Sequence, residues 1–135
     1  MTIKNKIRTK KKTVLFIDDE GVWLTAIKMA VKEAPFKVIT AEGGERALKE
    51  LHRHKPDLIL SDVRMPDING FDLFEKVKLD PTLKSIPYVF MSSIEDFDAK
   101  RTAKQIGADG YIEKPFNSAQ IKSVITGLLK QFQGE

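Results

Sequence analysis

The sequence predicts an α/β domain in which a five-stranded parallel sheet is covered by helices on both faces. Five short apolar runs rich in β-favouring residues alternate with five stretches whose apolar residues recur at helical spacing. Prolines and glycines punctuate the chain between many of these segments. Such alternation is typical of parallel strands joined by right-handed helical crossovers. At 135 residues the chain is long enough to form one such core.

The first strand is predicted at residues 13–17, a run dominated by β-favouring apolar side chains. The first helix follows from Trp23, where apolar residues recur every three or four positions until Pro35 ends the pattern. Residues 37–40 form a short second strand, and two consecutive glycines break the chain after it.

The second helix is indicated by apolar residues at positions 47–51, and Pro56 stops it before the next strand. Residues 58–61 are a compact apolar run, which predicts a short buried third strand. A loop rich in turn-forming residues follows, and residues 71–77 then show the helical spacing again.

The fourth strand is predicted at residues 88–91, and the fourth helix at residues 99–106. A short fifth strand occupies residues 110–113. The last helix begins at Asn117, where Gln120 three positions later forms a variant of the capping box. Its apolar residues have the most regular helical spacing in the chain.

Polar side chains follow the strands at the points where these end. Asp18 and Asp19 follow the first strand, Asp62 the third, Ser92 the fourth and Lys114 the fifth. The carboxyl ends of parallel strands share one edge of a sheet, where open α/β sheets place their ligand sites, so these side chains should converge. Taken alone, Asp62 can equally be a residue that caps a turn.

Three carboxylates at one edge repel each other, and at neutral pH they need a cation. A site made of oxygen ligands without His or Cys suits a hard ion, and Mg²⁺ before any transition metal. A carboxylate beside Mg²⁺, a lysine and a hydroxyl has the parts for phosphoryl transfer: a nucleophile, a metal, a fixed positive charge and a hydrogen-bond donor.

Four motifs closely resemble the receiver domain of two-component response regulators, of the chemotaxis-Y-like kind. They are Ile-Asp-Asp-Glu at 17–20, Ser-Asp-Val-Arg-Met-Pro-Asp-Ile-Asn-Gly at 61–70, Phe-Met-Ser-Ser at 90–93 and Gly-Ala-Asp-Gly-Tyr-Ile-Glu-Lys-Pro-Phe at 107–116. Each motif is weak alone, but four in this order on five βα units are a strong signal. The resemblance extends from residue 13 to about residue 132.

The resemblance implies a flavodoxin-like, doubly wound sheet with strand order 2-1-3-4-5. It implies that Asp62 is the phosphoacceptor and that Lys114 pairs with it and then with its phosphoryl group. Asp18 and Asp19 would be the acidic pair for Mg²⁺, with Asp19 binding directly and the backbone carbonyl of Arg64 helping. The domain would be a signalling phosphoacceptor that catalyses only its own phosphorylation and dephosphorylation.

The resemblance also implies a switch, with Ser92 as its hydroxyl and Tyr111 as its aromatic residue. Ser92 replaces the commoner Thr, which keeps the hydroxyl and loses a methyl group. The phosphoryl donor would be a sensor histidine kinase or a histidine phosphotransfer protein. The output would be docking of a downstream protein, or of a second copy, on the fourth helix, fifth strand and fifth helix. That face would carry Lys100, Lys104, Tyr111 and Lys122.

The net charge of +4 comes from the first twelve residues, which hold six basic residues and no acid. Residues 1–12 are therefore predicted to be a basic flexible arm, and residues 13–135 the receiver domain. The absence of cysteine fits a cytoplasmic location, and no apolar run is long enough to span a bilayer.

Two other functions compete with the signalling hypothesis. A phosphatase of the haloacid dehalogenase type needs a second Asp two residues after its nucleophile, and position 64 is Arg. The third hypothesis is a nucleic-acid binder that acts through the basic arm. It ranks last, and we do not expect this domain to contact nucleic acid, because no recognition-helix unit follows it.

Overall fold

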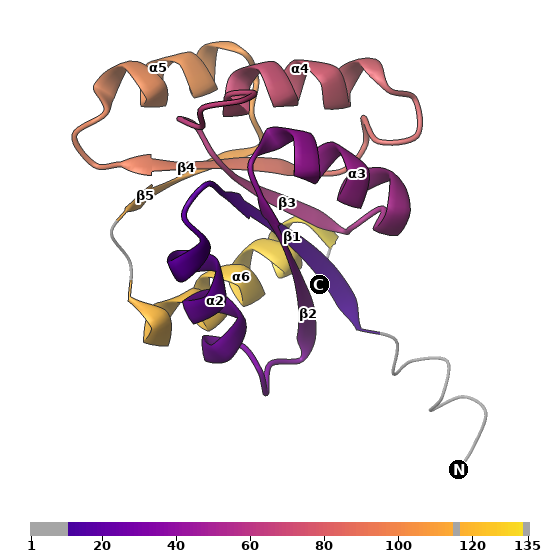
Figure 1. Cartoon of the computed structure of the whole chain (residues 1–135), viewed down its shortest axis with the longest axis vertical. Helices are drawn as coiled ribbons and strands as arrows, with labels where there is room; N and C mark the ends of the chain where they lie inside the picture. Colours follow the sequence, from indigo (N-terminus) through magenta and orange to yellow (C-terminus); the bar gives the residue numbers. More distant parts are fainter. Residues whose placement is uncertain (1–10, 115–116, 134–135) are drawn as a thin grey trace.

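The computed structural model describes residues 11–114 and 117–133, and Figure 1 shows its arrangement. The strands are β1 (Lys12–Asp18), β2 (Phe36–Glu42), β3 (Leu58–Asp62), β4 (Tyr88–Ser93) and β5 (Gly110–Lys114). The helices are α2 (Gly21–Ala30), α3 (Gly44–His54), α4 (Gly70–Leu79), α5 (Phe97–Gln105) and α6 (Ser118–Gln133). The predicted arm falls mostly on residues 1–10, outside the described residues, while Lys12 is the first residue of β1.

The five strands form one sheet in the order β2-β1-β3-β4-β5, and all four neighbouring pairs are parallel. This confirms the predicted fold class and strand order. A helix follows each strand, so every connection carries the chain back to the start of the next strand.

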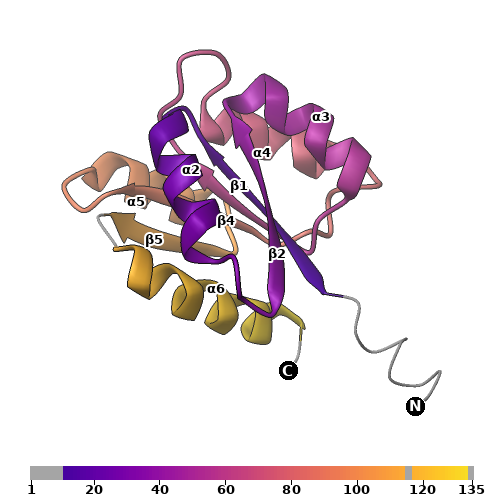
Figure 2. The same ribbon diagram turned by 60° about the horizontal axis from the view of Figure 1, so that its bottom comes forward.

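The sheet has helices on both faces (Figures 1 and 2) and separates two apolar cores. Helices α3, α4 and α5 cover one face, while α2 and α6 cover the other. Along β1, Leu15 and Ile17 belong to the first core, and Val14 and Phe16 belong to the second. This alternation follows from the two-residue period of a strand, and it explains why a central strand reads as an unbroken apolar run.

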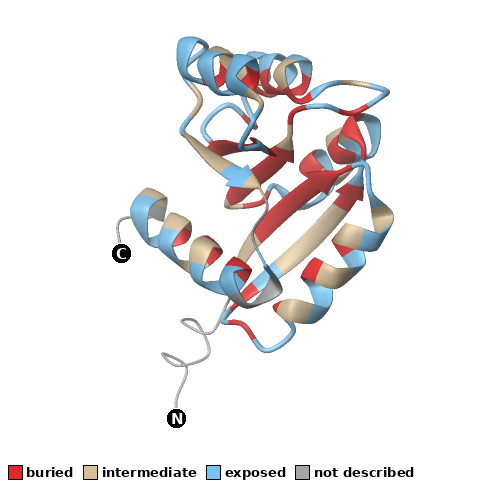
Figure 3. Ribbon diagram, turned by 90° about the vertical axis from the view of Figure 1, so that its left-hand side faces the viewer, coloured by how far each residue is buried: buried red, intermediate tan, exposed pale blue. Residues whose placement is uncertain are grey.

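Burial is greatest in the three central strands, as Figure 3 shows. In β3 the first four residues are buried, and Asp62, the last residue, is only partly buried. Of the two edge strands, β5 is mostly half-buried, whereas β2 combines buried, half-buried and exposed residues. Within the described residues, no helix is both long and apolar enough to cross a membrane.

Two helix ends bear on the predictions. Helix α2 ends at Ala30, so the predicted helix up to Pro35 was too long, although Val31 and Ala34 remain buried in the turn that follows. At the start of α6, Asn117 and Gln120 exchange hydrogen bonds of 3.0 and 2.8 Å between side chain and backbone amide. The predicted capping box is thereby confirmed.

Gly70 brings the start of α4 against the end of β3. A Cβ atom at this position would lie 2.3 Å from the carbonyl oxygen of Asp62, which no side chain tolerates. The Gly70 amide donates to the carbonyl of Val63 at 2.7 Å, and the buried hydroxyl of Tyr88 donates to the carbonyl of Gly70 at 3.1 Å. These contacts fix the backbone beside Asp62.

The loop between β3 and α4 is also tied to α3. Asp67 accepts hydrogen bonds from the amides of Gly44 and Glu45, at 3.2 and 2.9 Å. Gly43 precedes them with φ of +101°, a conformation that favours glycine, and a Cβ there would lie 3.1 Å from Asp67. Asp67 therefore caps α3 from another loop and holds that loop in place.

Candidate functional site

Three aspartates meet at the carboxyl edge of the sheet. Asp18 ends β1, Asp19 follows it, and Asp62 ends β3, which pairs directly with β1. Their side chains each offer an oxygen, and these oxygens all lie within 4.8 Å of one another. The predicted convergence of the three carboxylates is therefore present in the structure. Asp18 is fully buried, whereas Asp19 is exposed.

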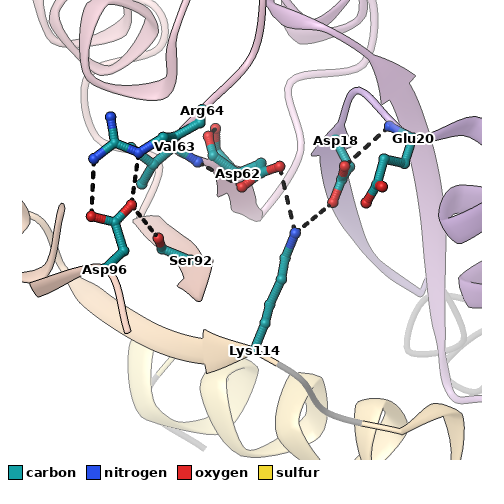
Figure 4. Close-up of polar contacts among 9 residues, drawn as sticks. Asp18, Glu20, Asp62, Val63, Arg64, Ser92, Asp96 and Lys114 are labelled. Carbon is teal, nitrogen blue, oxygen red and sulfur yellow. Dashed lines mark hydrogen bonds and ion pairs between the residues drawn. The ribbon is translucent and has the colours of Figure 1, made fainter. Parts of the chain in front are cut away.

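Lys114 reaches this cluster from β5, two strands away from β3 (Figure 4). Its Nζ lies 2.9 Å from Oδ2 of Asp18 and 3.5 Å from Oδ2 of Asp62. Burial alone would lower the pKa of Lys114, but the hydrogen bond to Asp18 and the charges of both aspartates outweigh it and raise that pKa. The ammonium group thus stays charged between the two carboxylates.

The Asp62 carboxylate is short of compensating charge. Burial raises its pKa to about 6, the charge of Lys114 opposes this rise, and repulsion from Asp18 adds to it. The Val63 amide donates to Oδ1 of Asp62 at 2.9 Å. One lysine cannot balance three carboxylates, so the site favours the binding of a further cation.

The donor set fits Mg²⁺. It consists of carboxylate oxygens alone, which is what this hard cation prefers. Both oxygens of Asp18 already accept protein hydrogen bonds, from Lys114 and from the amide of Glu20 at 3.1 Å. Asp19 is exposed and Asp62 partly so, and their oxygens are the better placed to bind an ion directly.

We therefore expect Asp19→Ala to weaken Mg²⁺ binding more than Asp18→Ala does, since Asp18 would act on the ion mainly through its charge. Loss of an indirect partner commonly costs about 10-fold in metal affinity, and loss of a direct ligand should cost more. The half-buried Trp23, at the start of α2, offers a fluorescence signal for the titration. Equal affinities of the two variants would contradict the ranking.

The predicted switch hydroxyl has a partner that sequence reasoning missed. Ser92 is buried, and its Oγ donates to Oδ2 of Asp96 at 3.1 Å. Arg64 binds the same carboxylate twice, from Nε at 2.7 Å and from Nη2 at 2.9 Å. The hydrogen bonds from Arg64 hold the pKa of Asp96 down at about 2. Figure 4 shows Asp62 between Lys114 and this second group of contacts.

Asp96 was identifiable only as a helix cap. It precedes the apolar pattern of α5, and its Oδ1 accepts the Ala99 amide at 3.1 Å. This is the signature of an N-cap residue, which by itself indicates no role at the site. Only the folded structure places it against Arg64 and Ser92.

Tyr111, the predicted switch aromatic, lies on β5 beside Phe90 of β4. It is half-buried and packs against the core under α5. Its hydroxyl is buried without a hydrogen-bond partner among the residues that the structure describes. A pocket of about 180 Å³ adjoins the ring and is lined by Lys100, Ala103, Lys104, Ala108, Gly110 and Tyr111. Lys122 is exposed on α6.

The comparisons with known proteins agree with the resemblance found in the sequence. The family model for the response regulator receiver domain matches residues 14–126. The chain is similar to the probable transcriptional regulator ycf27 of Cyanidium caldarium, with 31% identity over 133 residues, covering 98% of this chain and 52% of that protein. It is also similar to histidine kinase P4 of Formosa agariphila, with 35% identity over 130 residues, covering 96% of this chain and 9% of that protein.

Among solved structures, the chemotaxis protein CheY4 of Vibrio cholerae superposes with a TM-score of 0.78 at 27% identity. The match covers 87% of this chain and 98% of that one. By contrast, the chain spans about half the length of the transcriptional regulators that it matches.

Proposed function

Since the chain belongs to the receiver domain family of two-component response regulators, we propose that it accepts a phosphoryl group on Asp62 from a phosphohistidine donor. The observation that carries the proposal is the placement of Asp62, a partly exposed carboxylate within 4.8 Å of two others and 3.5 Å from Lys114. A carboxylate oxygen of Asp62 attacks phosphorus, the bond from phosphorus to the histidine nitrogen breaks, and an acyl phosphate forms.

Mg²⁺ would be bound directly by Asp19 and Asp62, with the backbone carbonyl of Arg64 as a further ligand and with Asp18 contributing mainly its negative charge. When bound, the ion supplies positive charge that offsets the phosphoryl oxygens. Lys114 is placed to exchange its ion pair with Asp62 for a contact with a phosphoryl oxygen, because its Nζ already lies 3.5 Å from Oδ2 of Asp62. Asp18 keeps the lysine in position during this change.

The signal leaves through the face formed by α5, β5 and α6. A phosphoryl group adds negative charge and three acceptor oxygens beside Ser92, and the serine hydroxyl moves toward them. Tyr111, on the neighbouring strand, then changes its packing in the pocket below α5. Phosphorylation in this scheme shifts a population that the unmodified protein already samples.

The partners of this scheme are a sensor histidine kinase or a histidine phosphotransfer protein upstream, and a downstream protein or a second copy of the chain. Lys100, Lys104 and Lys122 are exposed on the output face, which favours a partner with acidic groups. The location of such an exchange is the cytoplasm.

The direct test uses the wild-type protein and a small donor, acetyl phosphate. We expect the intact mass to rise by one phosphoryl group in the presence of Mg²⁺ and to stay unchanged when EDTA removes the ion. Absence of any Mg²⁺-dependent labelling would refute the proposed function. Turnover of small phosphate esters would instead support a phosphatase, and salt-dependent DNA binding would support the nucleic-acid reading.

A further inference from the structure

The Asp96 carboxylate accepts four hydrogen bonds from three separate parts of the chain. Its Oδ2 accepts Arg64 Nε at 2.7 Å and Ser92 Oγ at 3.1 Å. Its Oδ1 accepts Arg64 Nη2 at 2.9 Å and the Ala99 amide at 3.1 Å. One side chain therefore joins the loop after β3, the end of β4 and the first turn of α5. Figure 4 shows the first three of these contacts.

Both side chains that Asp96 holds come from the immediate surroundings of Asp62. Arg64 lies two residues after Asp62 on the same loop. Ser92 follows Met91, which is the residue of β4 paired with Asp62. A serine hydroxyl has a single proton, so it cannot donate to Asp96 and to a phosphoryl oxygen at once. Donation to one acceptor requires release from the other.

We propose that Asp96 is a positioning residue of the phosphoryl site, which keeps Ser92 and Arg64 bound to itself until a phosphoryl group on Asp62 competes for them. This inference rests on the proposed function. The competition is between two anionic acceptors at the same sheet edge. While Asp62 is unmodified, the Asp96 carboxylate keeps the hydrogen bonds of Ser92 and Arg64. The more highly charged phosphoryl group on Asp62 then displaces Asp96 as their acceptor.

The strength of the hydrogen bonds to Asp96 sets the balance between the resting and the active arrangement. Release of Ser92 and Arg64 costs charge-assisted hydrogen bonds at Asp96, and new ones to the phosphoryl oxygens offset the cost. A stronger hold by Asp96 keeps the resting population high, and a weaker hold lets the unmodified protein sample the active arrangement more often. Because Asp96 also caps α5, release of its other donors alters the contacts at the start of a helix on the output face.

The experiment measures the affinity for beryllofluoride, which mimics the phosphoryl group, by fluorine NMR at saturating Mg²⁺. In Asp96→Asn the carboxamide oxygen can still cap α5, but the negative charge that holds Arg64 is gone. We expect beryllofluoride to bind Asp96→Asn about fivefold more tightly than wild type, since a neutral acceptor holds both donors less strongly. The Mg²⁺ affinity of each variant is measured separately, so that an effect on the ion is recognised.

Asp98→Asn is the matched control. Asp98 lies in the same first turn of α5, is exposed and pairs with Arg101, so its substitution removes the same charge but no hydrogen bond to Ser92 or Arg64. We expect its affinity for beryllofluoride to stay within about twofold of wild type. An equal gain in both variants would mean that the general charge of the helix end is responsible, and the proposal would be overturned.

Further substitutions test whether the gain in beryllofluoride affinity depends on Ser92 and Arg64. The gain caused by Asp96→Asn should shrink in a Ser92→Ala background and disappear in a protein carrying both Ser92→Ala and Arg64→Gln. A gain that persists in this double background overturns the proposal, and so does an Asp96→Asn protein that binds no more tightly than wild type. Failure of the wild type itself to bind beryllofluoride would instead refute the proposed function.

Discussion

Asp62→Asn is expected to abolish phosphoryl transfer completely and, at the same time, to raise the melting temperature of the Mg²⁺-free protein. The amide lacks the nucleophilic carboxylate oxygen, so no acyl phosphate can form. The gain in stability has a separate cause. Burial, opposed by Lys114 and reinforced by Asp18, raises the pKa of Asp62 to about 6, so its charge at neutral pH destabilises the folded state.

The size and pH dependence of this gain follow from the pKa. A rise from 3.8 to about 6 corresponds to an upper limit of about 3 kcal/mol at pH 7. The folded protein holds the Asp62 proton more firmly than the unfolded chain does. The resulting stability is present below pH 3.8 and is lost as the pH rises through 6. Melting curves should therefore separate the variant from wild type at pH 7 and bring them together below pH 4.

Asp57→Asn is the matched control for this prediction. Asp57 precedes the same strand, and its carboxylate accepts the Thr13 amide at 2.8 Å, at the opposite edge of the sheet. We expect this variant to be labelled by acetyl phosphate as wild type is. Labelling of Asp62→Asn equal to wild type would show that another residue is the phosphoacceptor.

Lys114→Ala is expected to destabilise the Mg²⁺-free protein by about 3 kcal/mol, the typical cost of leaving a buried charge without its partner. The residue left behind is Asp18, which is fully buried and 2.9 Å from the lysine nitrogen. Added Mg²⁺ should recover part of this loss, because a bound cation compensates the same carboxylates. The measurement is the melting temperature of the variant and of wild type, each with and without Mg²⁺.

Lys100→Ala provides the comparison. Lys100 is paired with Glu113 at 3.2 Å on the protein surface, where solvent weakens the interaction. Its loss should change stability by less than about 1 kcal/mol, with no dependence on Mg²⁺. Two outcomes would contradict the prediction: equal melting temperatures of the two lysine variants, or no effect of Mg²⁺ on the difference between Lys114→Ala and wild type. Either would show that repulsion among the three aspartates does not destabilise the Mg²⁺-free protein.

The sequence was sufficient for those features that depend on where strands end. Asp18, Asp62 and Lys114 were predicted to meet because parallel strands bring their carboxyl ends to one edge, and the structure places them within hydrogen-bond or ion-pair distance. The start of α6 beside Asn117 was predicted from a capping box, and the structure contains its two reciprocal hydrogen bonds. In both examples the local sequence pattern and the order of the strands and helices indicate the same location for the residue.

The features that sequence reasoning missed depend on side-chain direction. The side chain of Arg64 lies on a loop, and nothing in the spacing of the motif indicates that it turns toward Asp96, 32 residues further on. The end of α2 was misplaced for a different reason: Val31 and Ala34 are buried by a turn and not by a longer helix. Apolar periodicity records burial and not the backbone conformation that achieves it.

The close approach at Gly70 has a mechanical consequence. Between the carbonyl of Asp62 and the first turn of α4 there is no side chain that can change rotamer and absorb a displacement. Backbone meets backbone, and the hydrogen bonds from Gly70 to Val63 and from Tyr88 to Gly70 prevent separation. If phosphorylation shifts the end of β3, we therefore expect the first turn of α4 to move with it. On the other side of the site, Arg64 and Ser92 contact Asp96 through side chains alone, and a side chain can adjust by changing rotamer.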